Sequence, residues 1–92
     1  MKYSVSASNL FKRQLKKVIK QGHSEEKIHK IVDTLAYGAF LDAHFNVHKL
    51  KGEYGGAWEL HIKSDLLLIY LKYEDPPHIK LVAIGTHSEL FG

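Results

Sequence analysis

The sequence predicts an α+β fold in which two helices cover one face of a small antiparallel sheet. Three observations lead to this prediction: apolar residues at helical spacing before residue 40, short alternating or apolar runs after residue 57, and tight turns between those runs. The chain has 92 residues, of which 45% are hydrophobic. That is enough for one core and too little for two, so we expect residues 1–92 to form a single domain.

The chain begins with a short strand that leads into a helix. Residues 2–6 alternate between polar and apolar side chains, as a strand does. Ser8 or Ser6 can cap a helix over residues 9–21, and Gly22 supplies its C-terminal stop. The apolar residues of this helix fall on one face: Phe11, Leu15, Val18 and Ile19.

A second helix follows directly. Ser24 is its predicted N-cap, and Glu25 and Glu26 place negative charge in its first turn, where the helix dipole favours it. One apolar face then continues through the helix: Ile28, Ile31, Val32, Leu35 and Ala39. The short connection at Gly22 predicts that the two helices form an antiparallel hairpin.

The C-terminal half predicts a three-strand meander. We expect an ordered loop over residues 42–56, then strands over residues 58–63, 66–73 and 79–84, and a short terminal segment from Gly85. Tight connections favour antiparallel pairing of these strands. Alternation in the first of them predicts two sets of side chains, Leu60 and Ile62 under the helices and Glu59 and His61 on the uncovered face.

The composition of the chain indicates the cellular compartment in which the protein is expected. It contains no cysteine, which excludes disulfides and thiolate zinc sites. No segment approaches the roughly 20 apolar residues of a membrane span, and the first residues lack the apolar centre of a signal peptide. We therefore expect a cytoplasmic protein with no membrane association.

Positive charge is concentrated near the N-terminus. The net charge is +3, but the first 23 residues hold six cations and no acid. These cations are Lys2, Lys12, Arg13, Lys16, Lys17 and Lys20. Such a surface suits an anionic partner, either nucleic acid or an acidic protein, although a merely solvated helix face would have the same pattern.

Three of the seven histidines are candidates for proton transfer. His48 lies where the loop enters the sheet, His61 lies on a strand, and His87 follows the last strand. Histidine donates and accepts protons near neutral pH, so a cluster can supply a general acid and a general base. Asp65, four residues after His61, could orient a histidine or stabilise its charge. In RNA such groups would move protons to and from the 2′-hydroxyl and the 5′-oxygen, with nearby lysines stabilising the phosphate.

The remaining candidates have simpler interpretations. Four histidines are interpreted as ordinary surface residues: His23, His29, His44 and His78. Three aromatic residues are interpreted as core or sheet-face side chains: Trp58, Tyr70 and Tyr73. Phe91 either fixes the C-terminal tail to the body or stacks on a ligand. No metal site is predicted, because no compact ligand pair such as HExxH occurs.

Three segments carry a resemblance to a known family. HKLKG at residues 48–52, ELHIKSDLLLIY at 59–70 and GTHSELFG at 85–92 occur in an order and spacing that resemble the YafQ-type branch of the RelE/ParE toxin superfamily. The resemblance spans essentially the whole chain and implies the RelE-like fold. It also implies a toxin of a bacterial type II toxin–antitoxin module that cleaves mRNA in the ribosomal A site, without a cofactor.

The resemblance also assigns roles to residues. It implies a catalytic group of His48, His61, Asp65 and His87, with Phe91 near it. His87 is the expected general acid and His48 the expected base, while the division of roles with His61 and Asp65 stays open. Two sets of cations are expected to make contacts: Lys49, Lys51, Lys63 with RNA, and Lys12, Arg13, Lys16, Lys17, Lys20 with ribosome or antitoxin.

Two departures from the family pattern concern catalysis. Leu66 stands where the family often has tryptophan, and Trp58 where arginine is common. Arg13 is the only arginine in the chain, which favours histidine chemistry over an arginine-dependent reaction.

The resemblance implies partners and leaves an alternative function. We expect a cognate acidic antitoxin, in a heterotetramer of two toxins and two antitoxins, besides the ribosome and mRNA. A non-catalytic toxin that inhibits DNA gyrase by binding, like the ParE branch, is the alternative, because fold alone does not separate the two.

Overall fold

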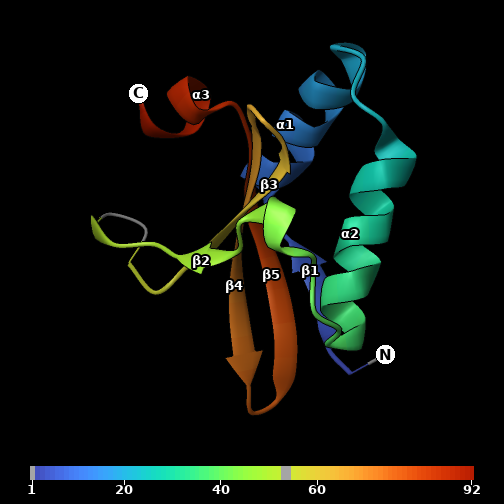
Figure 1. Cartoon of the computed structure of the whole chain (residues 1–92), viewed down its shortest axis with the longest axis vertical. Coiled ribbons are helices and arrows are strands. Elements are labelled where there is room, and N and C mark those ends of the chain that lie inside the picture. Colours follow the sequence, from blue (N-terminus) through green and yellow to red (C-terminus); the bar gives the residue numbers. More distant parts are fainter. Residues whose placement is uncertain (1, 53–54) are drawn as a thin grey trace.

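The structure is a computed structural model that describes residues 2–52 and 55–92. The elements follow one another as β1 (Ser4–Ala7), α1 (Asn9–Lys20), α2 (Glu25–Tyr37), the 3₁₀ turn η1 (Ala43–Phe45), β2 (His48–Lys49), β3 (Trp58–Lys63), β4 (Leu66–Glu74), β5 (Pro77–Gly85) and α3 (His87–Phe91) (Figure 1). The predicted α+β class, the two helices and the three-strand meander are confirmed.

The sheet is mixed and not purely antiparallel. Its strand order is β1-β5-β4-β3-β2, and β1 runs parallel to β5 while the other neighbours are antiparallel. The prediction of an antiparallel sheet is therefore wrong for β1. A tight turn fixes the direction of consecutive strands, but no turn joins β1 to β5, so local sequence does not set their relative direction.

Three short elements were not predicted. The expected loop over residues 42–56 contains η1 and β2, and residues 53–54 of that loop lie outside the described residues. The expected terminal segment forms α3. All three elements are too short to show a clear hydrophobic period: η1 and α3 are stabilised by packing on the sheet, and β2 by pairing within it.

The two faces of the sheet are packed differently. We call the side under α1 and α2 the helix face, and its core joins residues of both helices and the strands: Phe11, Val18, Ile28, Ile31, Leu35, Leu60, Ile62, Leu68, Tyr70, Ile79 and Leu81. The opposite side, the open face, has a smaller core of Ala57, Leu67, Ile69, Ala83 and Leu90. Burial of Leu60 and Ile62 under the helices is thus confirmed, and α3 covers part of the open face through Leu90.

Capping residues set the helix boundaries. The Ser8 hydroxyl accepts the backbone N–H of Phe11 at 3.0 Å, which confirms Ser8 as the cap of α1. The second helix ends at Tyr37, because Gly38 adopts a left-handed conformation with φ of 77°. Ala39 therefore lies outside α2 and is exposed, contrary to the prediction that it continues the apolar face.

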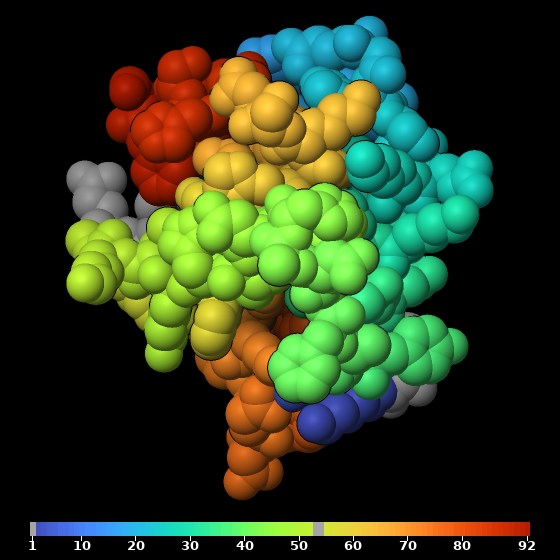
Figure 2. Space-filling view, in the orientation of Figure 1, coloured from blue at the N-terminus to red at the C-terminus, as the bar shows by residue number. Residues whose placement is uncertain are grey.

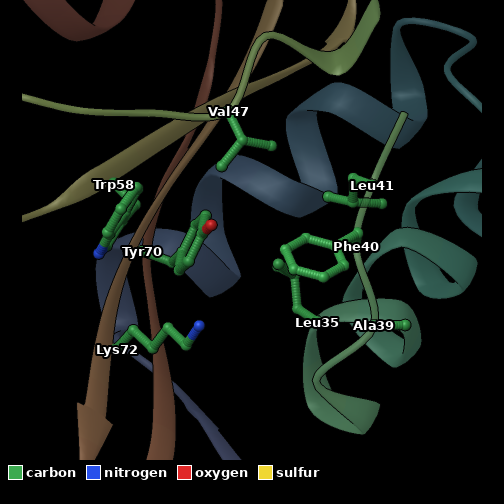
Figure 3. A pocket seen from close by; sticks show the side chains of 8 residues that line it. All are labelled: Leu35, Ala39, Phe40, Leu41, Val47, Trp58, Tyr70 and Lys72. Atoms are coloured by element: carbon green, nitrogen blue, oxygen red, sulfur yellow. The ribbon is translucent and has the colours of Figure 1, made fainter. Parts of the chain in front are cut away.

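The end of α2 leaves a hollow on the helix face. This hollow has a volume of about 210 Å³ and is lined by Leu35, Ala39, Phe40, Leu41, Val47, Trp58, Tyr70 and Lys72 (Figure 3). Burial raises the pKa of the Tyr70 hydroxyl in its wall to about 12. Among the described residues, no helix is long and apolar enough to cross a membrane.

Candidate active site on the open face

Two histidines and one carboxylate meet on the open face. His48 of β2 pairs with Glu59 of β3, so their side chains lie on the same side of the sheet, and His61 follows two residues along β3. Nε2 of His48 and Nε2 of His61 each lie 3.3 Å from Oε1 of Glu59. The two imidazole centroids are 6.3 Å apart. One carboxylate oxygen is therefore shared by two imidazoles.

Glu59 is the one buried polar or charged residue among those described, with 6% exposure. A buried carboxylate requires partners that compensate its lost hydration, and Nε2–H of His61, or of His48 when that ring is doubly protonated, can supply one. Sequence reasoning placed Glu59 on the same face as His61 but gave it no role. The pairing of Glu59 with His48 depends on β2, which the sequence did not predict.

A backbone contact orients His48. Its Nδ1 lies 2.8 Å from the carbonyl oxygen of Asn46, which can only accept a hydrogen bond. Nδ1 therefore carries the hydrogen, and Nε2 is the nitrogen that can exchange a proton with a ligand. Asn46 adopts a left-handed conformation with φ of 48° at the end of η1, and this turn directs its carbonyl toward the ring.

His87 reaches the open face on α3. It is exposed in the first turn of that helix, and its ring centroid lies 4.9 Å from that of Phe91. Leu90 anchors the helix on Leu67, Ile69 and Ala83. Because Leu67 and Ile69 pair with His61 and Glu59, α3 sits on the same sheet face as the two imidazoles.

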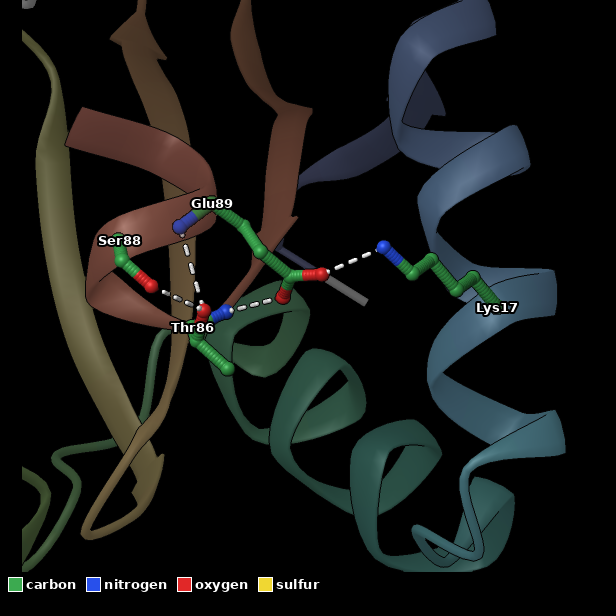
Figure 4. Close-up of polar contacts among 4 residues, drawn as sticks. All are labelled: Lys17, Thr86, Ser88 and Glu89. Carbon is green, nitrogen blue, oxygen red and sulfur yellow. Dashed lines mark hydrogen bonds and ion pairs between the residues drawn. The ribbon is translucent and has the colours of Figure 1, made fainter. Parts of the chain in front are cut away.

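A capping box and an ion pair hold α3 in place. The Thr86 hydroxyl accepts the N–H of Glu89 at 3.2 Å, and Oε1 of Glu89 accepts the N–H of Thr86 at 2.8 Å. Oε2 of Glu89 also pairs with Nζ of Lys17, on α1, at 2.7 Å (Figure 4). The Lys17 ammonium and these Thr86 hydrogen bonds lower the pKa of Glu89 to about 2.

Asp65 contacts α3 and not His61. Its Oδ1 lies 3.4 Å from the backbone nitrogen of His87, and no hydrogen bond or ion pair joins it to His61 in the described part of the chain. The register of β3 shifts between His61 and Lys63, which breaks the alternation on which the expected contact depended. Asp65 thus supports the start of α3, while Glu59 is the carboxylate beside His61.

Cations lie near the imidazoles. A hollow of about 430 Å³ opens beside His61 and is lined by Lys27, His44, His61, Ile62, Lys63 and Ser64. Lys51 is exposed, and Nζ of Lys49 lies 5.8 Å from the centre of the Trp58 ring. Lys63 therefore lies near His61 at the edge of the sheet, together with Lys27 of α2, which sequence reasoning did not select.

The predicted basic surface of α1 is confirmed in its position. Its five cations are all exposed: Lys12, Arg13, Lys16, Lys17 and Lys20. Lys17 differs from the others because it links α1 to α3 through Glu89.

A comparison with protein families identifies the chain. Residues 3–92 match the family described as the bacterial toxin of type II toxin–antitoxin system, YafQ. The chain belongs to the YafQ family. The resemblance carried by its three sequence segments is thereby confirmed.

Solved structures agree with this YafQ assignment. A metal-bound toxin from Helicobacter pylori is 35% identical, with a TM-score of 0.90 over 97% of this chain and 99% of that one. A copper-bound mutant toxin from the same organism is 31% identical, with a TM-score of 0.88 over the same shares. Escherichia coli YafQ, in complex with DinJ, is 24% identical and shares the fold, with a TM-score of 0.89 over 100% of each chain. No curated protein sequence matches the chain.

The metal-bound Helicobacter pylori toxins raise the question of whether this chain holds a metal. In this YafQ-family chain, no group of three His, Cys, Asp or Glu side chains within residues 2–52 and 55–92 is arranged to hold a metal ion. His48, His61 and Glu59 instead contact one another directly.

Proposed function

We propose that this chain is an mRNA interferase that cleaves mRNA in the ribosomal A site by acid–base catalysis, without a metal. The observation that supports the proposal is the grouping of His48, Glu59 and His61 on the sheet face to which α3 also carries His87. Inhibition by binding alone would not need two imidazoles around a buried carboxylate.

His48 is the proposed general base. Its Nε2 takes the proton of the RNA 2′-hydroxyl, and the 2′-oxygen then attacks the adjacent phosphorus. The carboxylate of Glu59, 3.3 Å away, stabilises the imidazolium that forms. His61 shares the same carboxylate oxygen and adds a second group that can hold positive charge near the phosphate.

His87 is the proposed general acid. As the bond between phosphorus and the 5′-oxygen breaks, His87 donates a proton to that oxygen, which leaves a 2′,3′-cyclic phosphate on the other fragment. Asp65, Thr86 and Glu89 position His87 by holding the start of α3. Lys27 and Lys63, which line the hollow beside His61, would stabilise the negative charge that develops on the phosphate.

An acidic antitoxin is the proposed partner. Escherichia coli YafQ forms a complex with DinJ, and the exposed cations of α1 give this chain a surface suited to an acidic protein. We propose a heterotetramer with two copies of each protein. DNA gyrase inhibition remains the alternative, and it predicts DNA damage with intact mRNA.

The test is cleavage of a defined mRNA on translating ribosomes, with mapping of the new 5′ ends. We expect cuts in frame with the codons, unchanged by a chelator that is selective for zinc and copper and leaves the magnesium of the ribosome in place. His48→Ala and His87→Ala should each lower the rate by roughly 10²–10⁴-fold, while His29→Ala, on the exposed surface of α2, should not. Full activity in the His48→Ala, His87→Ala double variant would exclude the mechanism, and loss of activity with chelator would show that a metal is required.

A further inference from the structure

Only part of the open face is covered. The pairing of β3 with β4 ends at Trp58 and Tyr70, and α3 packs near the other end of the sheet. Beyond Tyr70, the end of β4 and the start of β5 project from the body past β2, at the end of the sheet that lies away from α3 (Figures 1 and 2). This uncovered part, which we call the distal open face, consists of exposed or partly exposed residues: Ser4, Ser6, Leu71, Tyr73, His78 and Lys80.

The strand register shows that the distal open face continues the candidate active site. Leu67 and Ile69, which pair with His61 and Glu59, have the same parity along β4 as Leu71 and Tyr73. Across the sheet, Tyr73 pairs with His78, Leu71 with Lys80, His78 with Ser4, and Lys80 with Ser6. These side chains therefore lie on the same side as the catalytic group.

The imidazole of His78 is held in a fixed orientation. Its Nδ1 lies 2.6 Å from Oγ of Ser4, and its Nε2 lies 2.7 Å from Oγ of Ser6. The Tyr73 ring lies beside it, with centroids 6.4 Å apart and an angle of 31° between the rings. Tyr73 is 48% exposed. A ring that is already fixed loses little conformational entropy when a planar ligand stacks on it.

The charge of this surface favours an anion. Lys80 is exposed, and none of the six residues of the distal open face is acidic. Tyr73 lies four residues beyond Ile69 on β4, which is about 13 Å along the strand from the position opposite Glu59. A single-stranded RNA held at the catalytic group reaches this surface within a few nucleotides. Its bases can stack on the rings of Tyr73 and His78, and its phosphates can pair with the Lys80 ammonium.

We propose that the distal open face is a second binding subsite for the mRNA, where Tyr73 and His78 stack on a base and Lys80 contacts a phosphate. This inference rests on the proposed RNA cleavage, because the RNA that contacts the distal open face is the same molecule that is cut at the catalytic group. The serine hydroxyls of β1 position His78 and do not themselves select a base.

The test is an NMR titration of the ¹⁵N-labelled protein with a single-stranded RNA of about ten nucleotides, in which 2′-deoxy sugars prevent cleavage. NMR shifts report weak binding, so the ribosome is not needed. We expect saturable amide shifts in β1, at the end of β4 and at the start of β5. Shifts confined to α1 and α3, or no shifts, would overturn the proposal.

Matched variants separate stacking and charge from folding. Tyr73→Ala should weaken RNA binding about five- to tenfold, whereas Tyr73→Phe should keep it. Tyr37→Ala, at a tyrosine that is 66% exposed elsewhere, is the control for loss of an exposed ring. Lys80→Ala should reduce the slope of the logarithm of the RNA binding constant against the logarithm of salt concentration by about one, the value for one lost phosphate contact. Lys30→Ala should leave this slope unchanged.

The outcomes also separate this inference from the proposed catalysis. Wild-type RNA binding by Tyr73→Ala, together with inactive His48→Ala and His87→Ala variants, would overturn the subsite alone. Loss of RNA binding by Tyr73→Ala with full cleavage by the histidine variants would overturn the catalytic mechanism alone. Unchanged RNA binding by Tyr73→Ala with loss of antitoxin neutralisation would assign the surface to a protein partner and overturn the RNA subsite.

Discussion

Replacement of Glu89 tests whether the capping box and the Lys17 ion pair position His87. In Glu89→Ala, the N–H of Thr86 loses its acceptor at 2.8 Å and Lys17 loses its partner at 2.7 Å. Loss of a capping interaction costs about 1 kcal/mol. The Lys17 side chain is 62% exposed, so the ion pair adds only about 0.2–1 kcal/mol. We therefore expect the docking of α3 to weaken by roughly 1–2 kcal/mol, a factor of about 5–30 in the undocked population.

Glu89→Gln is the matched control, because glutamine can accept the same Thr86 N–H but cannot form the ion pair. The assay is amide hydrogen exchange at Leu90 and Gly92, whose N–H groups donate to the carbonyls of Thr86 and Ser88 at 3.1 and 2.9 Å. Protection should fall about 5–30-fold in Glu89→Ala and less than about fivefold in Glu89→Gln. Equal losses in the two variants, or none, would refute the assignment of this stabilisation to the cap.

The pH dependence of α3 gives an independent check. The pKa of Glu89 is lowered from 4.5 to about 2, mainly by Lys17 and then by Thr86. A carboxyl group whose pKa is lower in the folded state stabilises that state above its unfolded pKa, and this stabilisation disappears as the pH falls through the folded value. Protection of α3 in the wild type should therefore decline between about pH 4.5 and pH 2, and this decline should be absent from Glu89→Gln.

Three further variants test the site and the core. Glu59→Gln removes the charge that the two imidazoles share, and cleavage on ribosomes should fall roughly 10- to 100-fold with folding retained; a wild-type rate would remove Glu59 from the mechanism. Phe11→Ala empties a position that is 3% exposed, and the free energy of unfolding in denaturant should drop by about 3–5 kcal/mol. Gly38→Ala introduces a Cβ at φ of 77° and 2.8 Å from Cδ of Lys2, so the melting temperature should decrease, whereas no change would mean that the end of α2 is not constrained.

Much of the fold follows from local sequence. Ser8 and Ser24 mark helix starts because their hydroxyls accept N–H groups of the first turn, a contact that needs no distant residue. Alternation along β3 predicted which side chains face the helices, because the strand period is two residues. The helix α3 carried a local signal as well, since Thr86 and Glu89 have the spacing of a capping box.

The candidate site was only partly predictable. The sequence selected His48, His61 and His87 by residue type and spacing, and it placed Glu59 on the face of His61. It also expected Asp65 beside His61, but the register shift in β3 directs Asp65 toward the start of α3 instead. A bulge of this kind depends on the fit between neighbouring strands and has no reliable local signature.

The sequence by itself determined the α+β class, the two main helices, the meander and the residue types available for proton transfer, because each depends on neighbours along the chain. Only the tertiary structure decided that β1 runs parallel to β5 and that β2 brings His48 to Glu59. It also decided that Lys17 holds the helix of His87 and that Ser4 and Ser6 fix His78. These contacts join segments far apart in the chain, and the energy that selects them comes from packing and pairing across the sheet, which local sequence does not encode.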